Sequence, residues 1–170
     1  MKSVVRPEIH AGHIEVAVAT LIGWRRHTIV PNVSWGLNLR HECDLLILDD
    51  KGRFTEVEIK VTRSDLKADL KKTHGHSSKI ISRLIFAVPH ELLEFSLDVI
   101  PSRAGLITVK WDHYGGRFEA QWQRRCRHCK HFEKTGPETV LKFMSLGCMR
   151  IWSLKEHNYN RMALLKTAEK

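Results

Sequence analysis

An aspartate and a Glu-x-Lys triplet on neighbouring segments are the residues of this sequence whose types and spacing best suit a chemical role. Asp44 lies in the apolar segment 43–48, and Glu58 and Lys60 lie in the alternating segment 53–61. Residues two apart on a β-strand share one face, so Glu58 and Lys60 would project together. If a hairpin brings Asp44 opposite Glu58, two carboxylates converge beside an ammonium group.

Two carboxylates and a lysine in that arrangement suit metal-dependent hydrolysis of a phosphodiester. Hard oxygen ligands hold Mg²⁺ or Mn²⁺, which keeps several waters and can reach a phosphate. Such an ion activates a water and neutralises charge on the phosphoryl oxygens. The lysine can orient or deprotonate that water, or stabilise the transition state. The alternative is a solvated strand face with a weak surface ion pair, because Glu-x-Lys is common on strands.

Hydrophobic periodicity predicts the elements that would position these residues. Asp49 to Gly52 supply turn chemistry between the segments 43–48 and 53–61, which favours a hairpin. Ser64 is a suitable N-cap for the helix that follows. The order of elements predicts an α/β protein whose central mixed sheet is flanked by helices on both faces. The predicted strands are 28–33, 43–48, 53–61, 83–88, 105–111 and 117–122, and the predicted helices are 10–23, 65–73, 90–99, 138–146 and 153–166.

The charge balance favours a polyanionic partner. Lys and Arg outnumber Asp and Glu by 28 to 19, a formal net charge of +9 over 170 residues. Such an excess speeds the capture of nucleic acid, although it says nothing about sequence preference. No apolar run approaches the ~20 residues of a membrane span, and Met1 to Pro7 lack the apolar core of a signal peptide. We therefore expect a cytoplasmic protein without membrane contact, whose cysteines are reduced thiols or metal ligands.

A basic helix end and a donor-rich loop follow the triplet and are candidates for substrate contact. Lysines there would meet a phosphate backbone, and loop donors would clamp a phosphate or a strand end. For any one of these residues the plainer interpretation is a charged helix face or a mobile surface loop. The candidate substrate-binding residues are Lys71, Lys72, His74, His76, Ser77 and Lys79.

A second candidate site is a Cys-x-x-Cys pair in the basic segment 124–134. This spacing suits one tetrahedral Zn²⁺ with Cys148 as a third ligand and a histidine as the fourth, with His131 favoured over His128 or His157. The alternative is a basic loop that contacts nucleic acid, and the two are compatible. Cys43 is expected to pack as a small hydrophobe in its strand. The candidate zinc ligands are Cys126, Cys129, Cys148 and His131.

The tryptophans are predicted to serve packing more than base stacking. Trp111, Trp122 and Trp152 occupy apolar patterns and are expected in the core. Trp24 and Trp35 lie near predicted loop ends, where partial exposure is expected.

The stretch from His41 to Pro89 resembles the PD-(D/E)xK nuclease superfamily, and within it most closely the MmcB-like DNA-repair group and its phage-borne relatives. The matching features are Asp44, the triplet at 58–60, the segment SDLKAD at 64–69 and the strand end FAVP at 86–89. The segment AGLI at 104–107 looks like the usual continuation. The resemblance covers roughly residues 10–111 and, more weakly, the tail.

This resemblance implies a restriction-endonuclease-like α/β core with Asp44 and Glu58 as metal ligands and Lys60 as the catalytic lysine. Many members add a glutamate on the first helix, and Glu15 matches that position, where a solvated helix residue is the alternative. The literal Pro-Asp pair is absent from the first motif. Glu42, which would share the face of Asp44, is therefore a rival for its role.

We expect residues 1–123 to form the nuclease-like core, with a basic Cys-containing segment and C-terminal helices at 124–170 packed on the same domain. The predicted function is a Mg²⁺- or Mn²⁺-dependent DNA nuclease acting in repair, recombination or phage DNA metabolism, with homodimerisation as a way to cut both strands. Two alternatives are a non-catalytic nucleic-acid-binding module on the same fold and a small zinc-stapled interaction domain.

Overall fold

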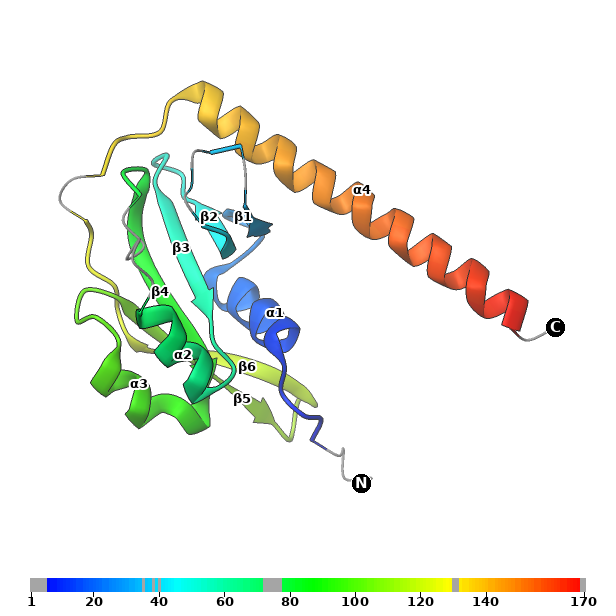
Figure 1. Cartoon of the computed structure of the whole chain (residues 1–170), viewed down its shortest axis with the longest axis horizontal. Coiled ribbons are helices and arrows are strands. Elements are labelled where there is room, and N and C mark those ends of the chain that lie inside the picture. Colours follow the sequence, from blue (N-terminus) through cyan, green and yellow to red (C-terminus); the bar gives the residue numbers. More distant parts are fainter. Residues whose placement is uncertain are drawn as a thin grey trace.

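A mixed β-sheet forms the centre of the protein in the computed structural model, which describes residues 6–34, 36–37, 39, 41–71, 78–129 and 132–168 (Figure 1). Across these residues the sheet has six strands in sequence order. The strands are β1 Thr28–Val33, β2 Cys43–Leu48, β3 Phe54–Ile59, β4 Ile81–Pro89, β5 Gly105–Asp112 and β6 Arg117–Arg124. The helices are α1 Ala11–Ile22, α2 Arg63–Leu70, η1 His90–Leu92, α3 Leu93–Val99 and α4 Pro137–Ala168.

The type of strand pairing changes twice across the sheet. β1, β2 and β3 are antiparallel, β3, β4 and β5 are parallel, and β6 is antiparallel to β5. Parallel neighbours need a crossover, and α2 and α3 supply the two that are required. The prediction of an α/β fold with a central mixed sheet and flanking helices is confirmed, and the arrangement is compatible with a restriction-endonuclease-like core.

One face of the sheet is covered by α1 and is apolar. Ile14, Ala17 and Val18 of α1 pack against inward side chains of β2 to β5, among them Val57 and Ile59 of β3. The predicted alternation of β3 is confirmed on this side. Burial of this face stabilises the fold at about 25 cal/mol per Å² of apolar area removed from water.

The opposite face carries two separate apolar clusters with polar residues between them. Phe54 packs edge-on against Phe143 of α4, with ring centroids 5.0 Å apart. A second cluster joins Leu66 of α2 to Phe86 and its neighbours on β4 and β5. Glu56 and Glu58 lie on this face, because Glu56 pairs with Leu84 and Glu58 with Phe86 in the β3–β4 register. A central strand of the sheet thus places buried carboxyl groups between two hydrophobic patches.

The C-terminal region differs from its prediction, because residues 137–168 form one continuous helix rather than helices at 138–146 and 153–166. Gly147 lies where α4 passes close to β1, since a Cβ at this position would be 3.2 Å from Cγ2 of Val30. The small residue permits this close approach without ending the helix.

The two halves of α4 have different environments. Phe143 and Leu146 are buried against the sheet, whereas the second half extends away from it (Figure 1). The first half of α4 thus contributes to the hydrophobic core of the sheet. Trp152, predicted as a core residue, is 68% exposed on the extended half, so that prediction is wrong. Despite its length, α4 is not apolar enough to cross a membrane, nor is any other helix in the described residues.

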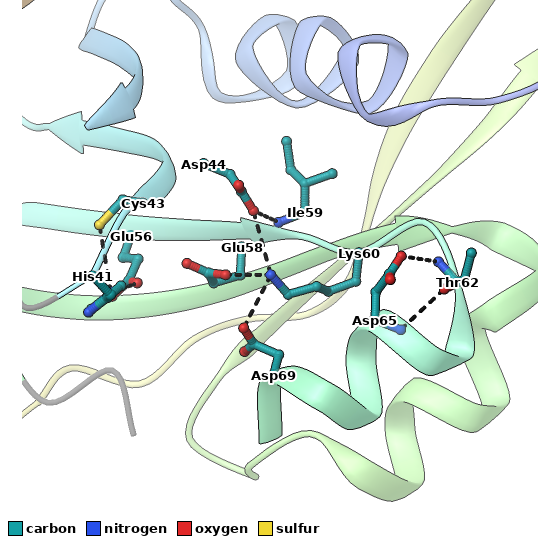
Figure 2. Close-up of polar contacts among 10 residues, drawn as sticks. All are labelled: His41, Cys43, Asp44, Glu56, Glu58, Ile59, Lys60, Thr62, Asp65 and Asp69. Carbon is teal, nitrogen blue, oxygen red and sulfur yellow. Dashed lines mark hydrogen bonds and ion pairs between the residues drawn. The ribbon is translucent and has the colours of Figure 1, made fainter. Parts of the chain in front are cut away.

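The start of α2 differs slightly from the prediction. Thr62, not Ser64, is the N-cap: its Oγ1 accepts a hydrogen bond from the Asp65 N–H at 3.1 Å, and Asp65 Oδ2 accepts one from the Thr62 N–H at 3.2 Å. This reciprocal capping box satisfies two otherwise unpaired N–H groups. It holds α2 directly after β3, over the polar residues of that strand (Figure 2).

Candidate functional site

The β2–β3 hairpin brings the predicted aspartate to the predicted triplet. Leu45 pairs with Val57, so Asp44 lies next to Glu58 across the two strands. Asp44 Oδ2 accepts a hydrogen bond from the backbone N–H of Ile59 at 2.7 Å. This bond fixes the Asp44 carboxylate at the end of β3, where Figure 2 shows it facing Lys60.

The Lys60 ammonium is the centre of a group of carboxylates, which we call the Lys60 cluster (Asp44, Glu58, Lys60 and Asp69). Lys60 Nζ is 2.5 Å from Glu58 Oε2, 3.3 Å from Asp69 Oδ1 and 3.6 Å from Asp44 Oδ2. The backbone N–H of Lys60 donates to the Ala87 carbonyl at 3.0 Å, which holds this residue alongside β4. Three sequence-predicted residues are thus brought together, with Asp69 as a fourth member.

The cluster is more buried than the sequence suggested. Glu58 and Lys60 are only 1% and 9% exposed, so they do not form the solvated strand face that was the alternative interpretation of this triplet. The physical reason is that α2 folds back over this face and contributes Asp69, itself buried. The Asp44 side chain, at 36% exposure, is the most accessible member of the cluster.

Burial and crowding perturb the acids and the base of the cluster. Burial raises the pKa of Glu58 to about 7, and the nearby Glu56 and Asp44 carboxylates add to this while Lys60 opposes it. Burial alone would lower the pKa of Lys60, but the carboxylates of Glu58, Asp44 and Asp69 raise it overall. The negative charge of these carboxylates therefore exceeds the single positive charge of Lys60. This local surplus of negative charge favours a divalent cation.

Glu15 of α1 lies within electrostatic range of Asp44. Its pKa is raised by burial and by the charge of Asp44. The side chain is partly buried rather than fully solvated. Glu42, the rival acid, is exposed, and it is Asp44 that contacts Lys60.

Asp69 was not among the candidate site residues of the sequence, although it ends the SDLKAD segment that matches the family. The spacing of Asp69 from Leu66 nevertheless indicates which way its side chain faces. Asp69 lies three residues after Leu66, and residues at i and i+3 share one side of a helix. Leu66 is fully buried, so the same side of α2 turns Asp69 towards the sheet.

A second polar group, the His41 cluster (His41, Cys43 and Glu56), lies beside the first on the same face of the sheet. His41 Nε2 forms an ion pair with Glu56 Oε1, and Cys43 Sγ is 3.9 Å from His41 Nε2. Cys43 is buried as predicted. His41 and Glu56 were not recognised from the sequence, because neither lies in a local metal-binding spacing.

The candidate substrate-binding residues are placed only in part. Lys71 is exposed at the end of α2, the helix that carries Asp69. Lys79 is exposed and its Nζ is 3.2 Å from Glu133 Oε1. The remaining residues of this prediction lie outside the described part of the chain: Lys72, His74, His76 and Ser77.

The cysteines of the predicted zinc site are not gathered together among the described residues. Cys126 packs against the α1-side core, and Cys148 is exposed on α4. His128 instead lies 3.1 Å from the Ser82 hydroxyl, and the Cys129 N–H donates to the Ser82 carbonyl at 2.8 Å. In the described ranges, the group of three potential ligands with atoms within 4.8 Å of one another is His41, Cys43 and Glu56. His131 lies outside these ranges.

The fold and site define an α/β protein that carries a buried carboxylate–lysine cluster at the end of a central strand. The chain belongs to the MmcB-like family of DNA repair proteins, whose model matches residues 3–157. A solved protein of unknown function from Silicibacter pomeroyi has the same fold, with a TM-score of 0.64 and 20% sequence identity over 90% of this chain and 96% of that one. Among curated proteins none matches this sequence. Membership of the family associates the protein with DNA repair.

Proposed function

We propose that this protein is a Mg²⁺- or Mn²⁺-dependent DNA nuclease of the PD-(D/E)xK type, with the Lys60 cluster as its active site. The observation that carries the proposal is the convergence of Asp44, Glu58 and Lys60. Lys60 Nζ lies 3.6 Å and 2.5 Å from the two carboxylates that metal-dependent phosphodiester hydrolysis requires. The DNA-repair family and the net charge of +9 support DNA as the substrate.

The residues present fit a hard divalent cation. Asp44 and Glu58 would hold it with carboxylate oxygens, and Glu15, whose pKa is raised by burial and by the charge of Asp44, is a candidate for a third acid. Burial and, to a smaller extent, the neighbouring carboxylates raise the pKa of Glu58, and a bound dication would stabilise its charged form. When bound, the ion would supply an activated water and neutralise charge on the phosphate.

The chain's own groups orient this site. The Ile59 N–H holds the Asp44 carboxylate in place, at the part of the cluster that solvent reaches. Glu58 and Asp69 hold the Lys60 ammonium from two sides, so its position is set before a phosphate arrives. Lys71 and Lys79 are exposed and would contact the DNA backbone.

The test is cleavage of single-stranded, nicked, branched and duplex DNA by the purified full chain with Mg²⁺ or Mn²⁺. The wild type is expected to cleave at least one of these substrates, and a chelator to stop the reaction. Asp44→Asn and Lys60→Met should lose cleavage, whereas Glu119→Gln, at a partly exposed acid on β6, should retain it. Wild-type rates in both cluster variants would remove the Lys60 cluster as the active site.

A second candidate function is a non-catalytic DNA-binding module on this fold. The near-complete burial of Glu58, at 1% exposure, favours it, because a scissile phosphate has little access to that carboxylate. This function predicts salt-sensitive DNA binding that survives Glu58→Gln, with no cleavage by any variant or by the wild type.

A further inference from the structure

The His41 cluster brings three different metal-binding groups to one point. The imidazole of His41, the thiol of Cys43 and the carboxyl group of Glu56 have potential ligand atoms within 4.8 Å of one another. Cys43 and Glu56 are fully buried, and the His41 side chain is 7% exposed. Figure 2 shows the three side chains pointing towards one another, apart from the Lys60 cluster.

We propose that the His41 cluster binds Zn²⁺, at a site separate from the Lys60 cluster. The donor types select this ion. Thiolate and imidazole ligands suit Zn²⁺, whereas Mg²⁺ and Mn²⁺ prefer carboxylate, carbonyl and water oxygens. Histidine, cysteine and carboxylate side chains are all ordinary zinc ligands in proteins.

The distances are close to those of a tetrahedral zinc site. With Zn–S of about 2.3 Å and Zn–N of about 2.0 Å, two ligands at the tetrahedral angle lie about 3.5 Å apart. Cys43 Sγ and His41 Nε2 are 3.9 Å apart. His41 Nε2 and Glu56 Oε1 are in direct hydrogen-bond contact, so they would separate by about 1 Å to share an ion at typical zinc bond lengths. His41 precedes β2 and is outside a strand, which permits this adjustment.

The charges also fit a dication. A zinc ion with one thiolate and one carboxylate has no net charge, so its burial leaves no isolated charge in the interior. The Glu58 carboxyl group, on the same face of β3 as Glu56, adds negative charge that attracts a cation, and zinc binding would release the thiol proton.

Such a site would connect the segment before β2 to the strand that carries the Lys60 cluster. Glu56 lies two residues before Glu58 on the same face of β3. A zinc ion held there would fix His41 to this strand. Three protein ligands leave a fourth position for water or another donor.

The experiment uses the full chain, stripped of metal under reducing conditions and titrated with Co²⁺ as a spectroscopic substitute for Zn²⁺. Wild-type protein is expected to develop a thiolate-to-cobalt charge-transfer band in the near ultraviolet, which stoichiometric Zn²⁺ abolishes. Cys43→Ala should lose the band. Cys148→Ser, which changes an exposed cysteine on α4, and Cys129→Ser should keep it.

Two further variants locate the ion. Glu56→Gln should weaken Zn²⁺ binding at least tenfold, because it removes an anionic ligand. Asp44→Asn should keep the cobalt band, so a loss of nuclease activity in this variant would not affect the zinc proposal. Circular dichroism establishes that each variant folds.

A measurement on the wild type keeps the proposal testable if Cys43→Ala does not fold. X-ray absorption of the zinc-loaded wild-type chain should show one sulfur ligand at about 2.3 Å beside nitrogen or oxygen ligands. The proposal would be overturned by a zinc coordination shell without sulfur or by a missing charge-transfer band in the folded wild type. A band that persists in folded Cys43→Ala would also overturn it.

Discussion

Glu56 and Glu58 occupy the same strand, the same face and nearly the same depth, yet they have different partners. Glu58 pairs with the Lys60 ammonium, whereas Glu56 pairs with the imidazole of His41 near the sulfur of Cys43. The strand gives both glutamates the same orientation. Their chemistry is then set by whichever element lies over each position, α2 for Glu58 and the segment before β2 for Glu56.

The two clusters therefore favour different cations. The Lys60 cluster offers oxygen ligands and an ammonium, which suits Mg²⁺ or Mn²⁺ and phosphate chemistry. The His41 cluster offers nitrogen, sulfur and one carboxylate, which suits Zn²⁺. Neighbouring sites of different ligand type can hold different ions in one protein without competition, and the following predictions test whether the division is real.

The largest expected effect is on DNA cleavage. Glu58→Gln removes a proposed metal ligand and should lower the single-turnover rate by about 10²- to 10⁴-fold. His41→Gln, in the other cluster, should lower it by less than tenfold. Rates are measured with saturating Mn²⁺ on whichever DNA substrate the wild type cleaves. An equal loss in both variants would mean that the two clusters work as one site.

Lys60→Met should have the largest effect on stability. The substitution removes the buried ammonium that neutralises Glu58, Asp69 and Asp44, and breaking a buried ion pair costs about 3–5 kcal/mol. Urea denaturation at neutral pH measures the change. Lys142→Met is the matched control, because its 3.0 Å pair with Glu138 is exposed and should be worth less than about 1 kcal/mol. Similar losses in the two variants would contradict the central role of Lys60.

Thermal unfolding with added metal should separate the clusters directly. An ion at a hundred times its Kd stabilises the folded chain by about 2.7 kcal/mol. The shift from Mn²⁺ should disappear in Asp44→Asn and persist in Cys43→Ala, and the shift from Zn²⁺ should show the reverse pattern. Both shifts disappearing together in either variant would refute separate sites.

The smallest expected effect concerns Asp69, a positioning residue for Lys60. Asp69→Asn keeps a hydrogen-bond acceptor but removes a charge, so we expect a loss of about 1.5 kcal/mol at pH 7. The interaction is fully present there, since pH 7 lies below the ordinary lysine pKa of about 10.4. The substitution should also lower the pKa of Lys60, because Asp69 is one of the carboxylates that raise it.

The alkaline limb of the pH–rate profile reports this change. In Asp69→Asn it should move to lower pH, whereas Asp65→Asn, which alters the capping box on the same helix, should leave it in place. A limb that does not move in Asp69→Asn would show that this carboxylate does not influence the reacting lysine.

Much of the fold was accessible from local sequence patterns. The predicted strand at 43–48 matches β2, and the strand at 53–61 contains β3, because short apolar or alternating runs and the turn before Phe54 are local signals. Gly52, in that turn, has a φ of 71°, a conformation that favours glycine. The long α4 was not predicted, because Gly147 serves close packing against the distant β1 and does not end the helix.

The features of the candidate site also fall into those that local sequence patterns predict and those that depend on tertiary contacts. Strand alternation and hairpin register were enough to place Asp44 beside Glu58 and Lys60, since neighbouring strands pair residue by residue. The burial of this group, the arrival of Asp69 and the meeting of His41 with Cys43 and Glu56 could not be read in the same way. They depend on how α2 and the segment before β2 fold back over the sheet, and such packing is set by long-range contacts that no local spacing encodes.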